Sequence, residues 1–132
     1  MVNNTLSDLY VRIKNGYSLK LEEVLVLRSK LVVKVLDILL LEGFIRGYSF
    51  NVKDFNKIKV LLKYSASGKK AIREIKGVSG SSRRLYVSVD VLWSFYSESD
   101  TTCLILSTSK GVIDLKTALK LNIGGELLCL VR

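Results

Sequence analysis

The chain has 132 residues, 48% of them hydrophobic, and carries a formal net charge of +9. This composition excludes a disordered chain, and the absence of histidine excludes Ser-His-Asp, Cys-His and histidine-ligated metal sites. Cys103 and Cys129 lie in separate apolar runs, so we expect buried free thiols with neither a disulfide nor a metal site. No apolar stretch is long enough to cross a bilayer, and we expect no N-terminal targeting leader.

Most of the positive charge lies in the middle of the chain. Between Arg46 and Arg84, eleven Lys or Arg residues stand against only Asp54 and Glu74. Such a concentration favours a polyanionic partner through counterion release. The alternative is a solvated sheet face, because surface lysines also keep an apolar protein soluble. The sequence also lacks proline, which favours an organelle-encoded protein through genomic base bias.

The first predicted lobe, residues 1–78, combines helices with an antiparallel sheet. A capping box at Thr5 and Asp8 predicts the start of a helix that ends at Asn15-Gly16, with Gly16 in a left-handed conformation. Ser29 is the predicted cap of a second helix. The resulting order is α-β-α-β-β-(β), with the helices on one face of the sheet. The predicted strands are 24–27, 44–52, 57–64 and 71–78, and the second helix is 31–42.

The second predicted lobe, residues 79–132, is rich in strands. The small, polar segment Ser79-Gly80-Ser81-Ser82 marks the predicted boundary between the lobes. The predicted fold class is therefore α+β, arranged as two small lobes, with one short helix in the second. The elements predicted for this lobe are strands at 85–91, 101–106 and 126–131, and a helix between Asp114 and Asn122.

The segment Ser107-Thr108-Ser109-Lys110-Gly111, called the hydroxyl turn below, follows an apolar predicted strand. A phosphate loop would need glycines ahead of the lysine, and this order lacks them. The hydroxyls could instead imitate backbone hydrogen bonds and simply build the turn. They could also contact RNA, because short hydroxyls donate and accept near a sugar-phosphate surface while Lys110 pairs with phosphate. The last two alternatives stay open.

Two nearby motifs could support an RNA contact. Arg83-Arg84-Leu85-Tyr86 combines guanidiniums, which bind phosphate, with a ring that can stack on a base. The alternative for Tyr86 is a half-buried strand residue. Gly124-Gly125-Glu126 predicts a corner with exposed backbone, where the carboxylate could accept from a base amino group. An ordinary hairpin or bulge is the alternative there.

Together these motifs resemble the bacterial-type ribosomal protein S-eight family, the eighth protein of the small subunit. The most specific are STSKGV and GGELLCLV, and DLYVRIKNG, SKLVVKVLDILLLEGFI, VLLKY and RRLYV extend the similarity over nearly the whole chain. The resemblance implies a two-lobed protein that binds the central domain of small-subunit rRNA and aids its assembly, without catalysis or a cofactor. It also implies neighbouring small-subunit proteins as partners, and no membrane, small-molecule substrate or homo-oligomer.

The family pattern also suggests where the RNA contacts lie. One departure is Ser79–Ser82, which stands where the family usually has Ser-[RK]-Pro-Gly, so we expect a more flexible turn before Arg84.

The alternative function is a translational repressor that binds an mRNA imitating the rRNA site. We expect a mitochondrial ribosome, with plastid or bacterial cytoplasm as alternatives. The predicted RNA-binding residues are Ser107, Thr108, Ser109, Lys110, Gly111, Arg84, Tyr86, Gly124, Gly125, Glu126, Lys30, Lys57, Lys14 and Asn15.

Overall fold

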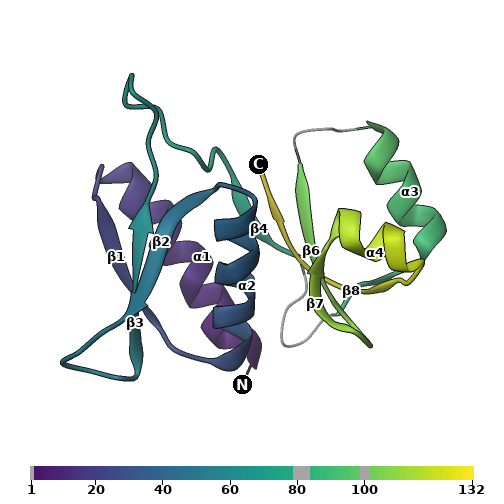
Figure 1. Ribbon diagram of the computed structural model, residues 1–132, viewed down its shortest axis with the longest axis horizontal. Helices are drawn as coiled ribbons and strands as arrows, with labels where there is room; N and C mark the ends of the chain where they lie inside the picture. The colour runs from purple at the N-terminus through teal and green to yellow at the C-terminus, as the bar shows by residue number, and fades with distance from the viewer. Residues whose placement is uncertain (1, 79–83, 99–101) are drawn as a thin grey trace. The chain divides into compact units, whose positions relative to one another are not determined.

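Two α+β units, each with its own antiparallel sheet, make up the chain (Figure 1). The computed structural model describes residues 2–78, 84–98 and 102–132. The units are Met1–Glu74 and Ile75–Arg132. Four helices and two sheets within the described residues confirm the predicted α+β fold class.

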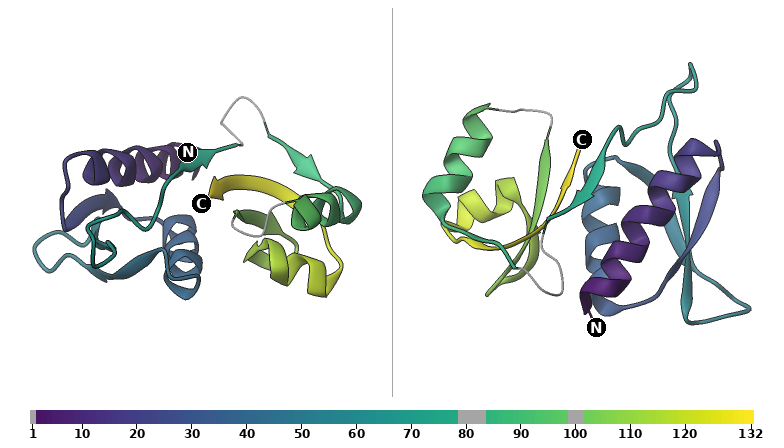
Figure 2. Two further views of the ribbon diagram at one scale, coloured as in Figure 1. Left: turned by 90° about the horizontal axis from the view of Figure 1, so that it is seen from above. Right: turned by 180° about the vertical axis from the view of Figure 1, so that it is seen from behind.

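In the first unit, two helices cover one face of a three-stranded sheet with the order β1-β3-β2 (Figure 2). The alternation predicted for β3 is confirmed, since Ile58, Val60 and Leu62 are buried while Lys57 and Lys59 are partly exposed. The elements are α1 (Val2–Ser18), β1 (Glu23–Leu27), α2 (Lys30–Leu41), β2 (Ile45–Phe50) and β3 (Lys57–Leu62).

Both ends of α1 differ from the sequence prediction. The helix begins before Thr5, whose hydroxyl oxygen lies 3.3 Å from that of Ser29. It continues through Gly16, where a Cβ atom would lie only 2.5 Å from Cγ1 of Val24. The predicted capping box and left-handed Gly16 are therefore wrong, because this glycine serves the close packing of helix against strand. The left-handed residue is Lys20, with φ 56°.

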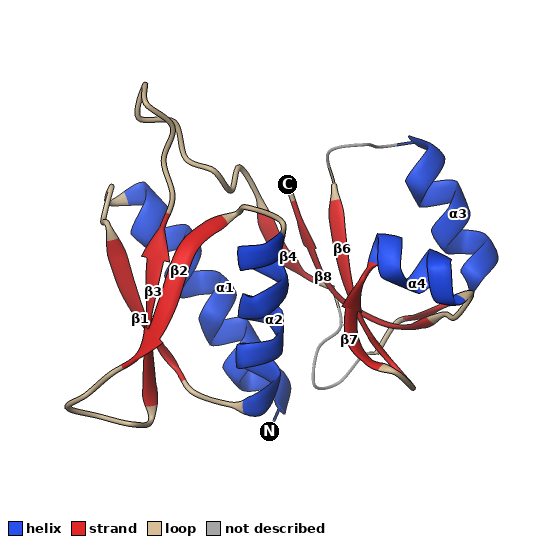
Figure 3. Ribbon diagram, in the orientation of Figure 1, coloured by secondary structure: helices blue, strands red, loops and turns tan. Residues whose placement is uncertain are grey.

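The second unit places helices α3 and α4 on one face of its sheet (Figure 3). Strands follow the order β4-β8-β6-β7, and β5 also pairs with β8. The elements are β4 (Ile75–Gly77), β5 (Tyr86–Val87), α3 (Val89–Glu98), β6 (Cys103–Thr108), β7 (Gly111–Asp114), α4 (Leu115–Leu121) and β8 (Gly125–Val131).

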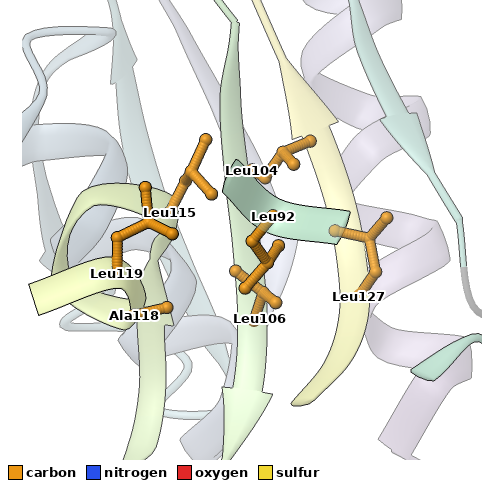
Figure 4. Close-up of a cluster of buried hydrophobic side chains, with 7 residues drawn as sticks. All are labelled: Leu92, Leu104, Leu106, Leu115, Ala118, Leu119 and Leu127. Carbon is orange, nitrogen blue, oxygen red and sulfur yellow. The ribbon is translucent and has the colours of Figure 1, made fainter. Parts of the chain in front are cut away.

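An apolar core holds these helices on the sheet (Figure 4). Each fully buried leucine there contributes about 1.5–3 kcal/mol relative to an exposed one. The core thereby fixes strands β6 and β8, which carry Ser107 and Glu126 of the candidate site. Its buried members are Leu92, Leu104, Leu106, Leu115, Ala118, Leu119 and Leu127.

The second unit has two helices where the sequence predicted one. The alternating pattern over 85–91 predicts a single strand, but the strand stops at Val87 and α3 follows. The helix is favoured because Val89, Leu92 and Tyr96 recur at helical spacing and Asp90 lies in the positive first turn.

The strand predicted at 71–78 is shorter than expected and belongs to the other sheet. Only β4 is extended, and Ile75 of this strand pairs with Val131 of β8. It therefore does not extend the first sheet. The predicted boundary segment 79–82 lies outside the described residues.

Three predicted helix boundaries are confirmed. The Ser29 hydroxyl caps α2 by accepting a 3.1 Å hydrogen bond from the Val32 amide. Asp114 caps α4 by accepting from the Thr117 amide at 3.2 Å. Asn122 ends α4 in the left-handed conformation with φ 56°.

No helix among residues 2–78, 84–98 and 102–132 is long and apolar enough to span a membrane. This part of the chain also contains no group of His, Cys, Asp or Glu able to hold a metal ion. Neither cysteine forms a disulfide; Cys129 is buried and Cys103 is partly exposed.

Candidate nucleic-acid interface

Three predicted site residues form one row across neighbouring strands of the second sheet. Ser107 of β6 is the register partner of Glu126 in β8, and Glu126 is also the partner of Tyr86 in β5. Paired residues on adjacent strands send their side chains to the same face. Because the neighbouring Leu106 and Leu127 lie in the core, the row lies on the face opposite α3 and α4. We call Ser107, Glu126 and Tyr86 the polar row.

The hydroxyl turn is a tight hairpin connection between β6 and β7. The Thr108 hydroxyl donates to the Gly111 carbonyl at 2.9 Å and accepts from the Lys110 amide at 3.1 Å. Gly111 has φ +105°, a conformation that L side chains rarely adopt. Thr108 and Gly111 therefore build the turn, as the structural alternative expected.

The remaining hydroxyls of the turn are available to a ligand. Ser109 and Lys110 are exposed, and Ser107 is partly exposed. Within the described residues, neither the Ser107 nor the Ser109 hydroxyl makes a hydrogen bond, in contrast to that of Thr108. These groups can exchange water for a ligand without breaking an internal contact.

Glu126 is an unusually buried carboxylate, with 9% of the residue exposed. Its Oε1 lies 3.8 Å from Nη1 of Arg84, whose side chain remains 58% exposed. In the part of the chain that the structure describes, this ion pair is its one polar contact, and the carboxylate accepts no hydrogen bond. A buried carboxylate with unfilled acceptor positions suits a ligand that donates a hydrogen bond. Tyr86, next in the row, is 68% exposed.

Gly124 and Gly125 allow the strands under the row to approach closely. A Cβ atom on Gly124 would lie 2.3 Å from the Val87 carbonyl oxygen, and one on Gly125 only 2.4 Å from that of Ser107. Real Cβ atoms essentially never come so near another atom. The two glycines thus serve close backbone packing, where the sequence suggested an exposed corner.

The other predicted residues belong to the first unit. Lys14 and Asn15 are exposed in the C-terminal half of α1, and Lys30 is exposed at the start of α2. Lys57 begins β3, where it is the register partner of Leu27. The register therefore places Lys57 beside Leu27, three residues before α2 begins at Lys30, whereas Lys14 and Asn15 belong to α1.

The sequence patterns did not predict an arginine–aromatic cluster that lies near Lys57. The Arg28 guanidinium lies over the Phe50 ring, 4.4 Å from its centroid. Its Nη1 also donates to the Phe55 carbonyl at 3.3 Å. No local pattern could signal this cluster, because the register of β1, β3 and β2 brings together residues far apart in sequence.

Comparison with known proteins places this basic α+β chain among the structural, non-enzymatic proteins of the small ribosomal subunit. The family model "Ribosomal protein S8" matches residues 4–132, and the chain belongs to this family. It is 41% identical over 130 residues to small ribosomal subunit protein uS8 of Wolinella succinogenes, covering 98% of each chain. The uS8 protein of Campylobacter lari is 40% identical over 134 residues, covering 99% of each. That of Orientia tsutsugamushi is 36% identical over 132 residues, with 98% of each covered.

These matches bear on several sequence predictions. They confirm the family resemblance, the small-subunit assignment and the prediction that the protein is not an enzyme. The three relatives are bacterial, which fits the bacterial alternative for location. The mitochondrial location stays a prediction without support among them.

Proposed function

We propose that the chain binds the central domain of small-subunit rRNA and aids its assembly through the second unit. The observation that carries this proposal is the polar row, in which a serine, a buried carboxylate and an exposed tyrosine lie side by side. The row and the hydroxyl turn would together face a folded RNA groove.

The chemistry of the row matches such a groove. The wide minor groove of RNA displays 2′-hydroxyls and base edges, which both donate and accept hydrogen bonds. The Ser107 and Ser109 hydroxyls can pair with donors and with acceptors of the RNA. Glu126 only accepts hydrogen bonds and would select a base amino group or a 2′-hydroxyl donor. Tyr86 offers an exposed ring for stacking on an unpaired base.

Positive charge beside the row would hold the phosphates. Lys110 is exposed at the tip of the hydroxyl turn, and Arg84 lies beside Glu126. The net charge of +9 adds a longer-range attraction for the RNA. Lys14, Asn15, Lys30 and Lys57 are proposed as further contacts from the first unit.

The salt dependence of binding separates these roles. We expect Lys110→Gln and Arg84→Gln each to reduce the slope of log affinity against log salt by about one. Ser109→Ala should lower affinity while leaving that slope unchanged, because it removes no charge. Filter binding of the purified chain to a central-domain rRNA fragment, at several salt concentrations, measures all three. Equal slopes for the three variants, or equal affinity for a fragment of another rRNA domain, would contradict the proposal.

The same surface could also serve translational repression. An mRNA that imitates the rRNA site would present the same groove to the polar row, so the two functions would share their contacts. The location within the cell is a separate matter: a bacterial ribosome agrees with the bacterial relatives, and a mitochondrial ribosome remains the alternative from the proline-free composition.

A further inference from the structure

An open pocket of about 240 Å³ lies between α3 and α4 of the second unit. The two helices share one face of the sheet (Figure 3). The strand registers and the core place the polar row on the opposite face. The pocket is therefore a different surface from the one proposed above. Its lining residues are Trp93, Tyr96, Lys116, Leu119 and Lys120.

Two large aromatic side chains of this pocket remain open to solvent. Trp93 is 50% exposed and Tyr96 is 41% exposed. Their rings meet edge to face, with centroids 6.0 Å apart and planes at 89°. Leu119 of α4 also lines the pocket, is nearly buried and belongs to the core. Helix α3 thus presents an exposed aromatic surface, and burial of these rings against a ligand would be favourable.

The two charged residues that line the pocket are both lysines. Lys116 and Lys120 lie four residues apart on α4, so both face the same side of the helix. Among the lining residues that the structure describes, none is acidic. An anionic ligand with a flat apolar part would therefore complement both features.

We infer that this pocket binds an unpaired nucleotide of a single-stranded RNA segment. The base would stack against Trp93 and Tyr96, and the flanking phosphates would pair with Lys116 and Lys120. Aromatic platforms beside a basic groove are the usual means of holding single strands, since every base has a flat face. An acidic protein segment is the competing occupant, but it would leave the ring faces without a stacking partner.

The single tryptophan makes this site directly observable. Trp93 is the only tryptophan in the chain, so its fluorescence reports on the pocket alone. We expect an RNA hexamer of uniform sequence to quench this fluorescence. A hexamer of abasic ribose phosphates, with the same charges and no bases, should leave it nearly unchanged. Equal quenching by the two hexamers, or quenching by an acidic peptide and not by RNA, would overturn the inference.

Variants identify the groups responsible. Tyr96→Leu keeps the apolar volume and removes the ring, and should weaken the affinity read from Trp93 quenching by about tenfold. Lys116→Gln with Lys120→Gln should weaken it by a similar factor, whereas Lys34→Gln, an exposed lysine of α2, should change it less than about twofold. Unchanged affinity for both pocket variants would overturn the inference, with thermal unfolding run on each to confirm folding.

The two RNA surfaces can be tested independently. Ser107→Ala with Ser109→Ala should leave the Trp93 signal intact, because these hydroxyls lie on β6 and its turn and not among the pocket residues. Failure of central-domain rRNA binding with intact quenching would reject the proposed function alone. Intact rRNA binding without quenching by the hexamer would reject the pocket alone.

Discussion

Replacing Gly125 by alanine is expected to destabilise the second unit by about 2 kcal/mol and to weaken rRNA binding more than tenfold. The added Cβ would lie 2.4 Å from the Ser107 carbonyl oxygen and 2.8 Å from Cγ2 of Thr108. The Ser107 carbonyl oxygen belongs to the backbone and cannot rotate away as a flexible side chain can. Strand β8 must therefore move away from β6. That movement separates Ser107 from Glu126 and breaks the polar row, which adds a loss of affinity to the loss of stability.

Gly47→Ala is the matched control for this change. Gly47 lies in β2 of the first unit, and a Cβ there would meet only the Leu61 side chain, at an ordinary 3.9 Å. We expect its effect on the free energy of unfolding to stay within about 0.5 kcal/mol. Urea unfolding of both variants gives the comparison. Equal stability of the two alanine variants would show that the row does not depend on close backbone approach at Gly125.

Removing both available hydroxyls should weaken binding without weakening the fold. Ser107→Ala with Ser109→Ala is expected to reduce affinity for the central-domain fragment about thirtyfold, since each net hydrogen bond contributes about 1 kcal/mol. Stability should hardly change, because neither hydroxyl has a hydrogen-bond partner within the described residues. Filter binding at constant salt, combined with urea unfolding, measures both quantities.

Thr108→Val provides the opposite signature. Its hydroxyl donates to the Gly111 carbonyl and accepts from the Lys110 amide, so loss of these two hydrogen bonds should destabilise the turn by about 2 kcal/mol. If the double serine variant instead lost stability and kept its affinity, the hydroxyls would be structural, as the simpler alternative for this turn holds.

Local sequence patterns were enough to predict many individual elements. The alternation along β3 and the caps at Ser29, Asp114 and Asn122 depend on neighbouring residues, and the structure confirms them. The prediction failed at Gly16, where a residue suited to end a helix is kept by tertiary packing against Val24. Local signals do not say which part of the chain will pack against a glycine.

Alternation was misleading where two periods overlapped. Residues 85–91 alternate like a strand, yet Val89, Leu92 and Tyr96 also fit one helical face, and burial of Leu92 in the core favours the helix. The aromatic pocket could not be predicted either, because it forms only where α3 packs beside α4 and the sequence pattern did not predict α3.

The candidate site was predicted by motif, but its arrangement was not. Ser107, Glu126 and Tyr86 come from three separate segments of the sequence. Only the registers of β6 and β5 with β8 make them neighbours on one face. The sequence also could not tell which hydroxyls of the turn are structural. The Thr108 hydroxyl bonds to the Gly111 carbonyl within the turn, while Ser109 remains exposed.

The most direct test of the central claim is photocrosslinking from the hydroxyl turn. A benzophenone amino acid in place of Ser109, in chains assembled into small subunits, reports what lies against this turn. We predict a crosslink to the central domain of small-subunit rRNA, and none at that site from the same group placed at Lys34 of α2. Crosslinks to protein alone, or no crosslink from position 109 in fully assembled subunits, would contradict the assignment of this surface to rRNA.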